Sequence, residues 1–216
     1  MDRVMGYISS LSILIPIILI LRNYFIQNKL IPLNIVAYVL IGGFFEIVII
    51  LQNILFSKNT IWLANIFALI EAGFILYSYN IWSNNIKYKK NYIILLSIYV
   101  FIWFYVVFIF GLETLNSTIN GTESLVVIIA SICFLYDGYI NNSLNMKNKW
   151  QIIICCAFLY YFIVNAGIYS FSAFFLDNNQ KENWIYFSVI HLIGNVGINI
   201  LLGIGLYQCN KQLLSV

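Results

Sequence analysis

Long apolar stretches alternate with short polar connections along the whole chain, and this pattern predicts membrane-spanning helices. Each stretch has about the 20 residues that a helix needs to cross the hydrocarbon core of a bilayer. We therefore expect an all-α fold, a polytopic membrane helix bundle that forms one domain over residues 1–216. The seven expected transmembrane helices occupy approximately 5–26, 33–56, 61–82, 92–112, 121–140, 150–176 and 184–208.

Composition supports this class of protein and excludes others. The chain is 62% hydrophobic and only 9% charged, whereas a soluble domain has about 25% charged residues. A membrane barrel would show strands of alternating polarity, which are not evident here. The net charge of +3 comes from scattered connecting lysines. The chain has no stripe of basic residues, so we expect no nucleic-acid partner. The expected partner of most of the surface is the lipid bilayer.

The basic residues of the connections predict an orientation. Eight of them fall on one side of the expected bundle: Arg22, Lys29, Lys87, Lys89, Lys90, Lys147, Lys149 and Lys211. Three fall on the other side: Arg3, Lys58 and Lys181. Because cytoplasmic loops carry the excess of Lys and Arg, we expect the N-terminus outside and the C-terminus inside. The expected location is the cell inner membrane, crossed several times.

Polar residues inside the expected spans mark candidate chemistry. From the helical rise of about 1.5 Å per residue, several of them lie at compatible depths, roughly 10–15 Å from the outer ends of their spans. Glu123 lies only a few Å in by the same estimate. The sequence thus predicts a polar, acidic pocket in the outer half of the bundle. Its candidate ligand-binding residues are Glu46, Asn65, Glu71, Glu123, Asn165, His191, Asn195 and Asn199.

Three states are open to the buried acids. No Lys or Arg lies in the middle of an expected span, so Glu46 and Glu71 have only His191 as a basic partner. The acids can be protonated and hydrogen-bonded, since a low dielectric disfavours the charged form. One can pair with a protonated His191, or both can face a wet cavity and bind a cation or an amine. For the asparagines, an alternative role has equal weight, in which their side chains form hydrogen bonds that join neighbouring helices.

Other features of the spans predict packing rather than chemistry. The stretch 92–112 has almost no polar residue, which predicts the greatest exposure to lipid. The last span contains Gly194, Gly197, Gly203 and Gly205, and small residues let neighbouring helices approach closely. We expect these glycines to serve helix packing.

Several motifs together resemble a family. They are Asn65-x5-Glu71, Asn116-Ser117-x5-Glu123-Ser124 and His191-x3-Asn195-x3-Asn199-Ile-Leu, found with Glu46 in the second span. The set is similar to a family of small, uncharacterised seven-helix integral membrane proteins common in Bacteroidota. The resemblance covers nearly the whole chain and implies the seven-helix fold. It departs in the sixth span, where Trp150 lies far from Asn165-Ala166-Gly167.

The same residues narrow the function classes. A retinal protein needs a Schiff-base lysine in its last helix, and the stretch 184–208 has none. Seven-helix zinc hydrolases need several histidine ligands, and His191 is the only histidine. We expect no metal and no cofactor. The favoured function is a receptor or sensor-like module that binds a small polar or cationic ligand and signals through a membrane or cytoplasmic partner protein. A small-solute or proton-coupled transporter is the first alternative, and an intramembrane hydrolase or transferase using Glu and His is the second.

Overall fold

The computed structural model describes residues 9–27, 32–56, 60–83, 85–113, 117–140, 149–177 and 181–213. All regular structure within these ranges is helical, which confirms the predicted all-α class. The helices are α2 (Leu14–Gln27), α3 (Leu33–Phe56), α4 (Ile61–Trp82), α5 (Ile86–Phe110), α6 (Ser117–Ile140), α7 (Lys149–Asp177) and α8 (Lys181–Leu213).

Six of the described helices, α3 to α8, are long and apolar enough to cross a membrane. The first helical stretch is shorter, because its apolar part covers only Ser9–Tyr24. The expected span 5–26 is therefore found as a shorter helix with an interruption near its start, and its first four residues lie outside the described ranges. The predicted class, a multi-pass membrane helix bundle, follows from the six long apolar helices.

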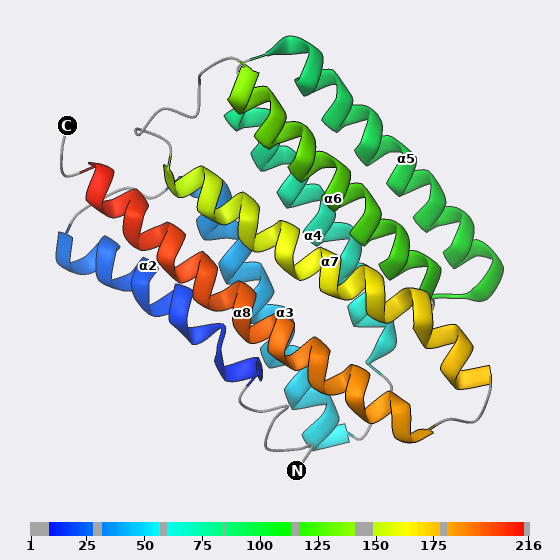
Figure 1. Ribbon diagram of the computed structural model, residues 1–216. Coiled ribbons are helices and arrows are strands. Elements are labelled where there is room, and N and C mark those ends of the chain that lie inside the picture. The colour runs from blue at the N-terminus through cyan, green and yellow to red at the C-terminus, as the bar shows by residue number, and fades with distance from the viewer. Residues whose placement is uncertain are drawn as a thin grey trace.

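The helices pack with nearly aligned axes (Figure 1). One layer runs α2, α8, α7 and α6, with α8 packed against both α2 and α7. Behind it lie α3 and α4, and α5 covers the outer edge of α4 and α6 (Figure 1). α4 contacts α3, α5 and α6, so the polar side chains on α4 meet several neighbours.

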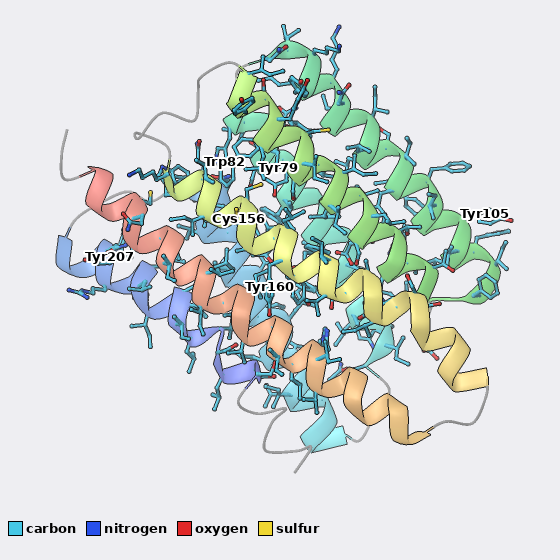
Figure 2. All side chains as sticks on the ribbon, viewed as in Figure 1. Tyr79, Trp82, Tyr105, Cys156, Tyr160 and Tyr207 are labelled. Carbon is cyan, nitrogen blue, oxygen red and sulfur yellow. The ribbon has the colours of Figure 1, made fainter. Side chains whose placement is uncertain are left out.

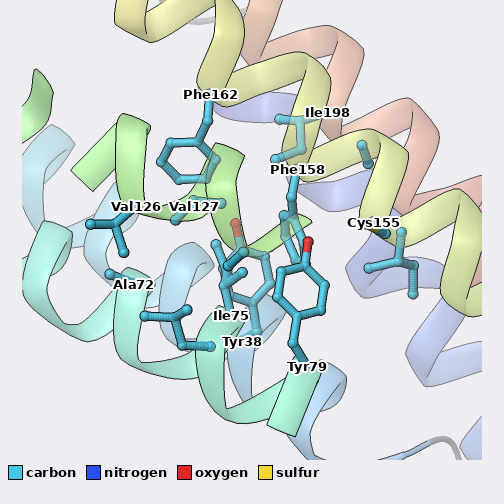
Figure 3. Packing of buried hydrophobic residues seen from close by; sticks show 14 of the residues in the cluster. Tyr38, Ala72, Ile75, Tyr79, Val126, Val127, Cys155, Phe158, Phe162 and Ile198 are labelled. Atoms are coloured by element: carbon cyan, nitrogen blue, oxygen red, sulfur yellow. The ribbon is translucent and has the colours of Figure 1, made fainter. Parts of the chain in front are cut away.

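An aromatic cluster fills the space between the layers. The ring of Tyr79 in α4 stacks on Phe134 in α6, with ring centroids 5.1 Å apart. Tyr38 in α3 meets Phe158 in α7 edge to face, also at 5.1 Å. Figure 3 shows Tyr38, Tyr79 and Phe158 beside Ile75 and Phe162. The cluster thus joins α3, α4, α6 and α7. It lies about two turns along α4 from the polar side chain of Glu71.

α5 presents mostly apolar side chains outward. Only 17% of the most apolar stretch of this helix is buried inside the molecule, which is the smallest share among the six candidate spans. Phe101, Phe104 and Phe108 are exposed, and Tyr105 points away from the bundle (Figure 2). The prediction that this segment is the most lipid-exposed span is consistent with this placement.

The glycines of α8 allow close approach, as predicted. A Cβ atom at Gly205 would lie 2.6 Å from Cγ1 of the buried Ile154 in α7. At Gly197 it would lie 2.6 Å from the ring of Tyr160, also in α7. Gly203 faces Ile15 of α2 in the same way, at 3.0 Å. The missing side chains therefore let α8 sit between α7 and α2.

Candidate functional site

A small polar cavity lies among α3, α4, α7, α8 and the segment that precedes α2. Its volume is about 60 Å³. Two carboxyl groups line it, Glu46 from α3 and Glu71 from α4, together with the amides of Asn195 and Asn199 from α8. The other lining residues are Ile13, Tyr38, Gly42, Phe67, Tyr161, Ile198 and Leu202. Among the described residues, no lysine or arginine lines the cavity, so this part of its wall has an excess of acidic groups.

Glu71 sits at the middle of α4, ten residues after Ile61 and eleven before Trp82. The Tyr38 hydroxyl donates a 2.7 Å hydrogen bond to Glu71 Oε1. Both side chains are buried, with 7% of Glu71 exposed. Since a phenol donor stabilises an ionised acceptor more than a neutral one, this bond favours the charged form of Glu71.

Glu46 lies across the cavity and is half-buried. Ser10 Oγ donates a 2.9 Å hydrogen bond to Glu46 Oε2. The electrostatic interaction between Glu46 and Glu71 is repulsive when both are charged. Two carboxylates facing one low-dielectric space need a proton or a cation to share it.

Three serines lie next to the cavity, on the segment that precedes α2. Ser10 bonds to Glu46, as described above, and Ser9 and Ser12 bond to α8. Asn195 Nδ2 donates to Ser9 Oγ at 2.8 Å, and Asn199 Nδ2 donates to Ser12 Oγ at 2.7 Å. These contacts align the serine segment in parallel with α8. We call residues 9–13 the serine segment from here on.

The backbone of the serine segment is interrupted beside the cavity. Residues 9–11 are helical, Ser12 and Ile13 form a turn, and α2 begins at Leu14. Pro16 has no N–H, so the Ser12 carbonyl cannot accept the usual bond from the residue four positions on. It accepts from Ile15 N at 3.0 Å instead. The first helix is thus broken at the depth of Asn199.

His191 and Asn165 form a pair next to the cavity without lining it. The His191 Nδ1 and Asn165 Oδ1 atoms are 2.9 Å apart. With the amide oxygen facing the ring, Nδ1 carries the proton and donates. The His191 ring lies 6.2 Å from the ring of Tyr161, which lines the cavity. The proposed pairing of His191 with an acid is not seen in the described residues, where Nδ1 is bonded to the Asn165 amide.

Glu123 lies behind the cavity, on α6. It is 5% exposed, and its Oε1 atom has no hydrogen-bond partner among the described residues. It does not line the cavity, although it interacts electrostatically with Glu71. The α4–α6 contact brings the two acids near each other.

Asn65 is placed apart from the other predicted site residues. Its Nδ2 donates to the Leu112 carbonyl at 2.8 Å, and its own carbonyl accepts from Trp103 Nε1 at 2.8 Å. These bonds join the start of α4 to the end of α5. Asn65 therefore serves the helix-joining role that was its alternative at the sequence level.

The eight predicted residues thus divide by position. Glu46, Glu71, Asn195 and Asn199 share the cavity, while Asn165 and His191 flank it and Glu123 lies behind it. The sequence reasoning missed Tyr38, Tyr161 and the three serines. A signal for the serines was present, because Ser9, Ser10 and Ser12 precede Pro16 inside an apolar stretch.

Fold and site together define a multi-pass membrane helix bundle with an acidic internal cavity. No protein-family model, no curated protein and no solved structure matches this chain.

Proposed function

We propose that this membrane protein binds a small cation in the cavity between Glu46 and Glu71 and acts as a sensor-like module. The observation that carries the proposal is the placement of two acidic residues on one small cavity, with no Lys or Arg among the described residues that line it. Carboxylate and amide oxygens are the ligands that hard cations prefer. Membrane-embedded acids of this kind commonly mark ion sites.

The size of the cavity limits the ligand. Pockets for drug-sized organic ligands have volumes of about 300–1,000 Å³, whereas this cavity has about 60 Å³. It has room for a few water molecules or one small ion. We infer a monovalent cation such as an alkali ion or ammonium, which narrows the predicted class of small polar or cationic ligands.

A sensor-like role follows from which elements meet at the cavity. A cation held by α3 and α4 changes the repulsion between Glu46 and Glu71, and Ser10 couples Glu46 to the serine segment. Occupancy would therefore bias the position of the first helix against α8. A partner protein in the membrane or cytoplasm would read that position. We place this module in the cell inner membrane, with its N-terminus outside.

Thermal stabilisation of the purified protein tests cation binding. Sodium, potassium and ammonium chlorides are each titrated against choline chloride at constant ionic strength. A ligand that binds the native state raises Tm with its concentration, so at least one small cation should raise Tm and choline should not. Calorimetric titration of that cation gives its affinity.

Conservative variants locate the site. Glu71→Gln and Glu46→Gln should weaken the cation response at least tenfold, whereas Glu113→Gln, at an exposed position after α5, should leave it unchanged. Each variant must first show a cooperative melting transition without added cation. Equal stabilisation by choline, or an unchanged cation response in both cavity variants, would refute the proposal.

A second candidate function is transport, and the broken first helix favours it. Transporters often build ion sites at discontinuous helices whose unwound backbone lines a cavity, and the interruption at Ser12–Ile13 adjoins this one. Proteoliposomes with a cation gradient test this function by measured flux. Transport requires flux in the wild type that Glu71→Gln removes, and equal flux in both would sink this candidate.

A further inference from the structure

Ser12 uses its hydroxyl in a way that fixes the direction of a neighbouring amide. The Ser12 hydroxyl donates a 2.5 Å hydrogen bond to the Ser9 carbonyl, which also accepts from the Ser12 backbone N–H at 3.1 Å. A serine hydroxyl has one proton to donate and two lone pairs that accept. Because that proton is used inside the serine segment, Ser12 Oγ can only accept a hydrogen bond from α8.

Asn199 therefore presents its NH2 group, and not its oxygen, to Ser12. The Asn199 Nδ2 atom donates to Ser12 Oγ at 2.7 Å. The oxygen and nitrogen of an amide are told apart by the hydrogen bonds around them, and a flipped amide would place two acceptors against each other here. Both side chains are buried, with 7% of Ser12 and 3% of Asn199 exposed, so that arrangement would be costly.

The Asn199 oxygen is left for the cavity. Asn199 lines the cavity, and within the described ranges no hydrogen bond reaches its Oδ1 atom, although this atom is not fully buried. Glu71 also has an oxygen to spare, since the Tyr38 hydroxyl bonds to Oε1 and leaves Oε2. One oxygen from α4 and one from α8 are thus available to the same small space.

The same pairing of a serine with an asparagine occurs at a second place, away from the cavity. Ser78 Oγ donates to the Phe74 carbonyl at 2.8 Å and accepts from Asn34 Nδ2 at 2.8 Å. This pair joins α3 to α4, and neither Ser78 nor Asn34 is among the residues that line the cavity. It is a matched control, because the same two kinds of hydrogen bond can be removed there without changing the cavity wall.

We propose that Ser12 is a positioning residue that holds the Asn199 amide oxygen toward the cavity, and that this oxygen is a ligand of the bound cation. Oxygen ligands replace the hydration shell of an alkali cation, whereas an NH2 group at the same place would repel it. The wall therefore favours a cation over a neutral solute that accepts hydrogen bonds. The ligand role of Asn199 rests on the proposed cation site, whereas the orientation of the amide does not.

Nuclear magnetic resonance of protein labelled in asparagine observes the amide directly. The Asn199 signals are identified by their loss in Asn199→Leu. In choline chloride, one side-chain N–H of Asn199 should exchange slowly with solvent in the wild type and at least about tenfold faster in Ser12→Ala. Addition of sodium, potassium or ammonium chloride, whichever raises Tm, should shift the side-chain carbonyl signal of Asn199 and leave that of Asn34 in place.

Calorimetric titration measures the consequence for binding. Ser12→Ala should weaken the cation affinity about tenfold, whereas Ser12→Thr, which keeps the hydroxyl, should bind nearly as well as the wild type. Ser78→Ala should leave the affinity unchanged. In the Asn199→Leu background, Ser12→Ala should have no further effect, because two residues that act through one oxygen are not additive. If Ser12→Ala does not melt cooperatively, the Asn199 carbonyl shift in the wild type decides the ligand role.

The outcomes separate this inference from the proposed function. Cation binding with equal affinities in Ser12→Ala and Ser78→Ala, or with an unmoved Asn199 carbonyl signal, would support the cation site and overturn the ligand role of Asn199. A wild type that binds none of these cations would refute the cation site and the ligand role with it. Equal N–H exchange of Asn199 in the wild type and Ser12→Ala would overturn the positioning role of Ser12, whether or not a cation binds.

Discussion

At the scale of single residues, the hydrogen-bonding partner decides what each buried polar side chain does. Asn65 and Asn199 are the same residue type at similar burial, 1% and 3% exposed. The Asn65 amide donates to a backbone carbonyl at a helix end. The Asn199 side chain instead lines the cavity and donates to a serine hydroxyl. Residue identity alone therefore does not separate asparagines that join helices from asparagines that line the cavity.

Tyr38 supplies the residue-scale prediction. Tyr38→Phe removes the hydroxyl that donates to Glu71 and leaves the aromatic packing on Phe158 in place. Because the lost bond favours the Glu71 carboxylate, cation affinity should fall about tenfold, which corresponds to about 1.4 kcal/mol. Calorimetric titration measures the change. Tyr105→Phe, at an exposed position on α5, is the matched control, and equal affinities in both variants would show that Tyr38 does not stabilise the anion.

At the scale of elements, helix packing follows from small side chains on α8. Gly205→Ala places a Cβ atom 2.6 Å from Ile154 Cγ1, whose side chain is fully buried and cannot move away freely. We expect a loss of stability of about 1–3 kcal/mol, as for overpacked cores.

A glycine in open space provides the comparison for Gly205. Gly167 on α7 has no atom within 4 Å of a built Cβ, so Gly167→Ala should leave stability unchanged or raise it through better helix propensity. Melting temperatures of both variants in the same detergent check this prediction. A lower Tm for Gly167→Ala than for Gly205→Ala would contradict the packing argument.

The serine segment gives a second prediction at this scale. Replacing Ser9, Ser10 and Ser12 together by alanine removes three bonds that hold the segment against Glu46 and α8. Net contributions of such bonds are about 0.5–1.5 kcal/mol each, so opening of the segment should become at least tenfold more frequent.

Stopped-flow mixing measures that opening as the rate of cation dissociation. The triple serine variant should release cation faster than the wild type. Ser97→Ala removes a hydroxyl that bonds only within its own helix, at Ile93 O on α5, and should not change the rate. Identical rates in all three proteins would show that the serine segment does not control access to the cavity.

At the scale of the whole molecule, the arrangement of charge predicts orientation. Eight of eleven basic residues fall on the side of the C-terminus, so we expect the C-terminus in the cytoplasm. A fluorescent protein fused after Val216 should fluoresce in cells, and alkaline phosphatase fused there should be inactive. The reverse pattern would show that the bundle has the opposite orientation in the membrane.

The amino-acid sequence by itself determines the class of this molecule. Hydropathy is a property of consecutive residues, so the apolar stretches predict helices and their approximate ends, and six long apolar helices are found where they were expected. The interruption of the first helix was not predicted, because its cause combines Pro16 with three serines whose partners lie on α3 and α8.

Only the tertiary structure decides which polar groups meet. Ser9 and Asn195 are separated by 186 positions in the chain, and their contact depends on the order of the helices and on the rotation of each about its axis. A depth estimate places Glu46, Glu71, Asn165 and Asn195 at similar heights but contains no rotation. The fold places Glu46 and Glu71 on one cavity, Glu123 behind it and Asn165 at its flank, because each helix turns a different face to its neighbours.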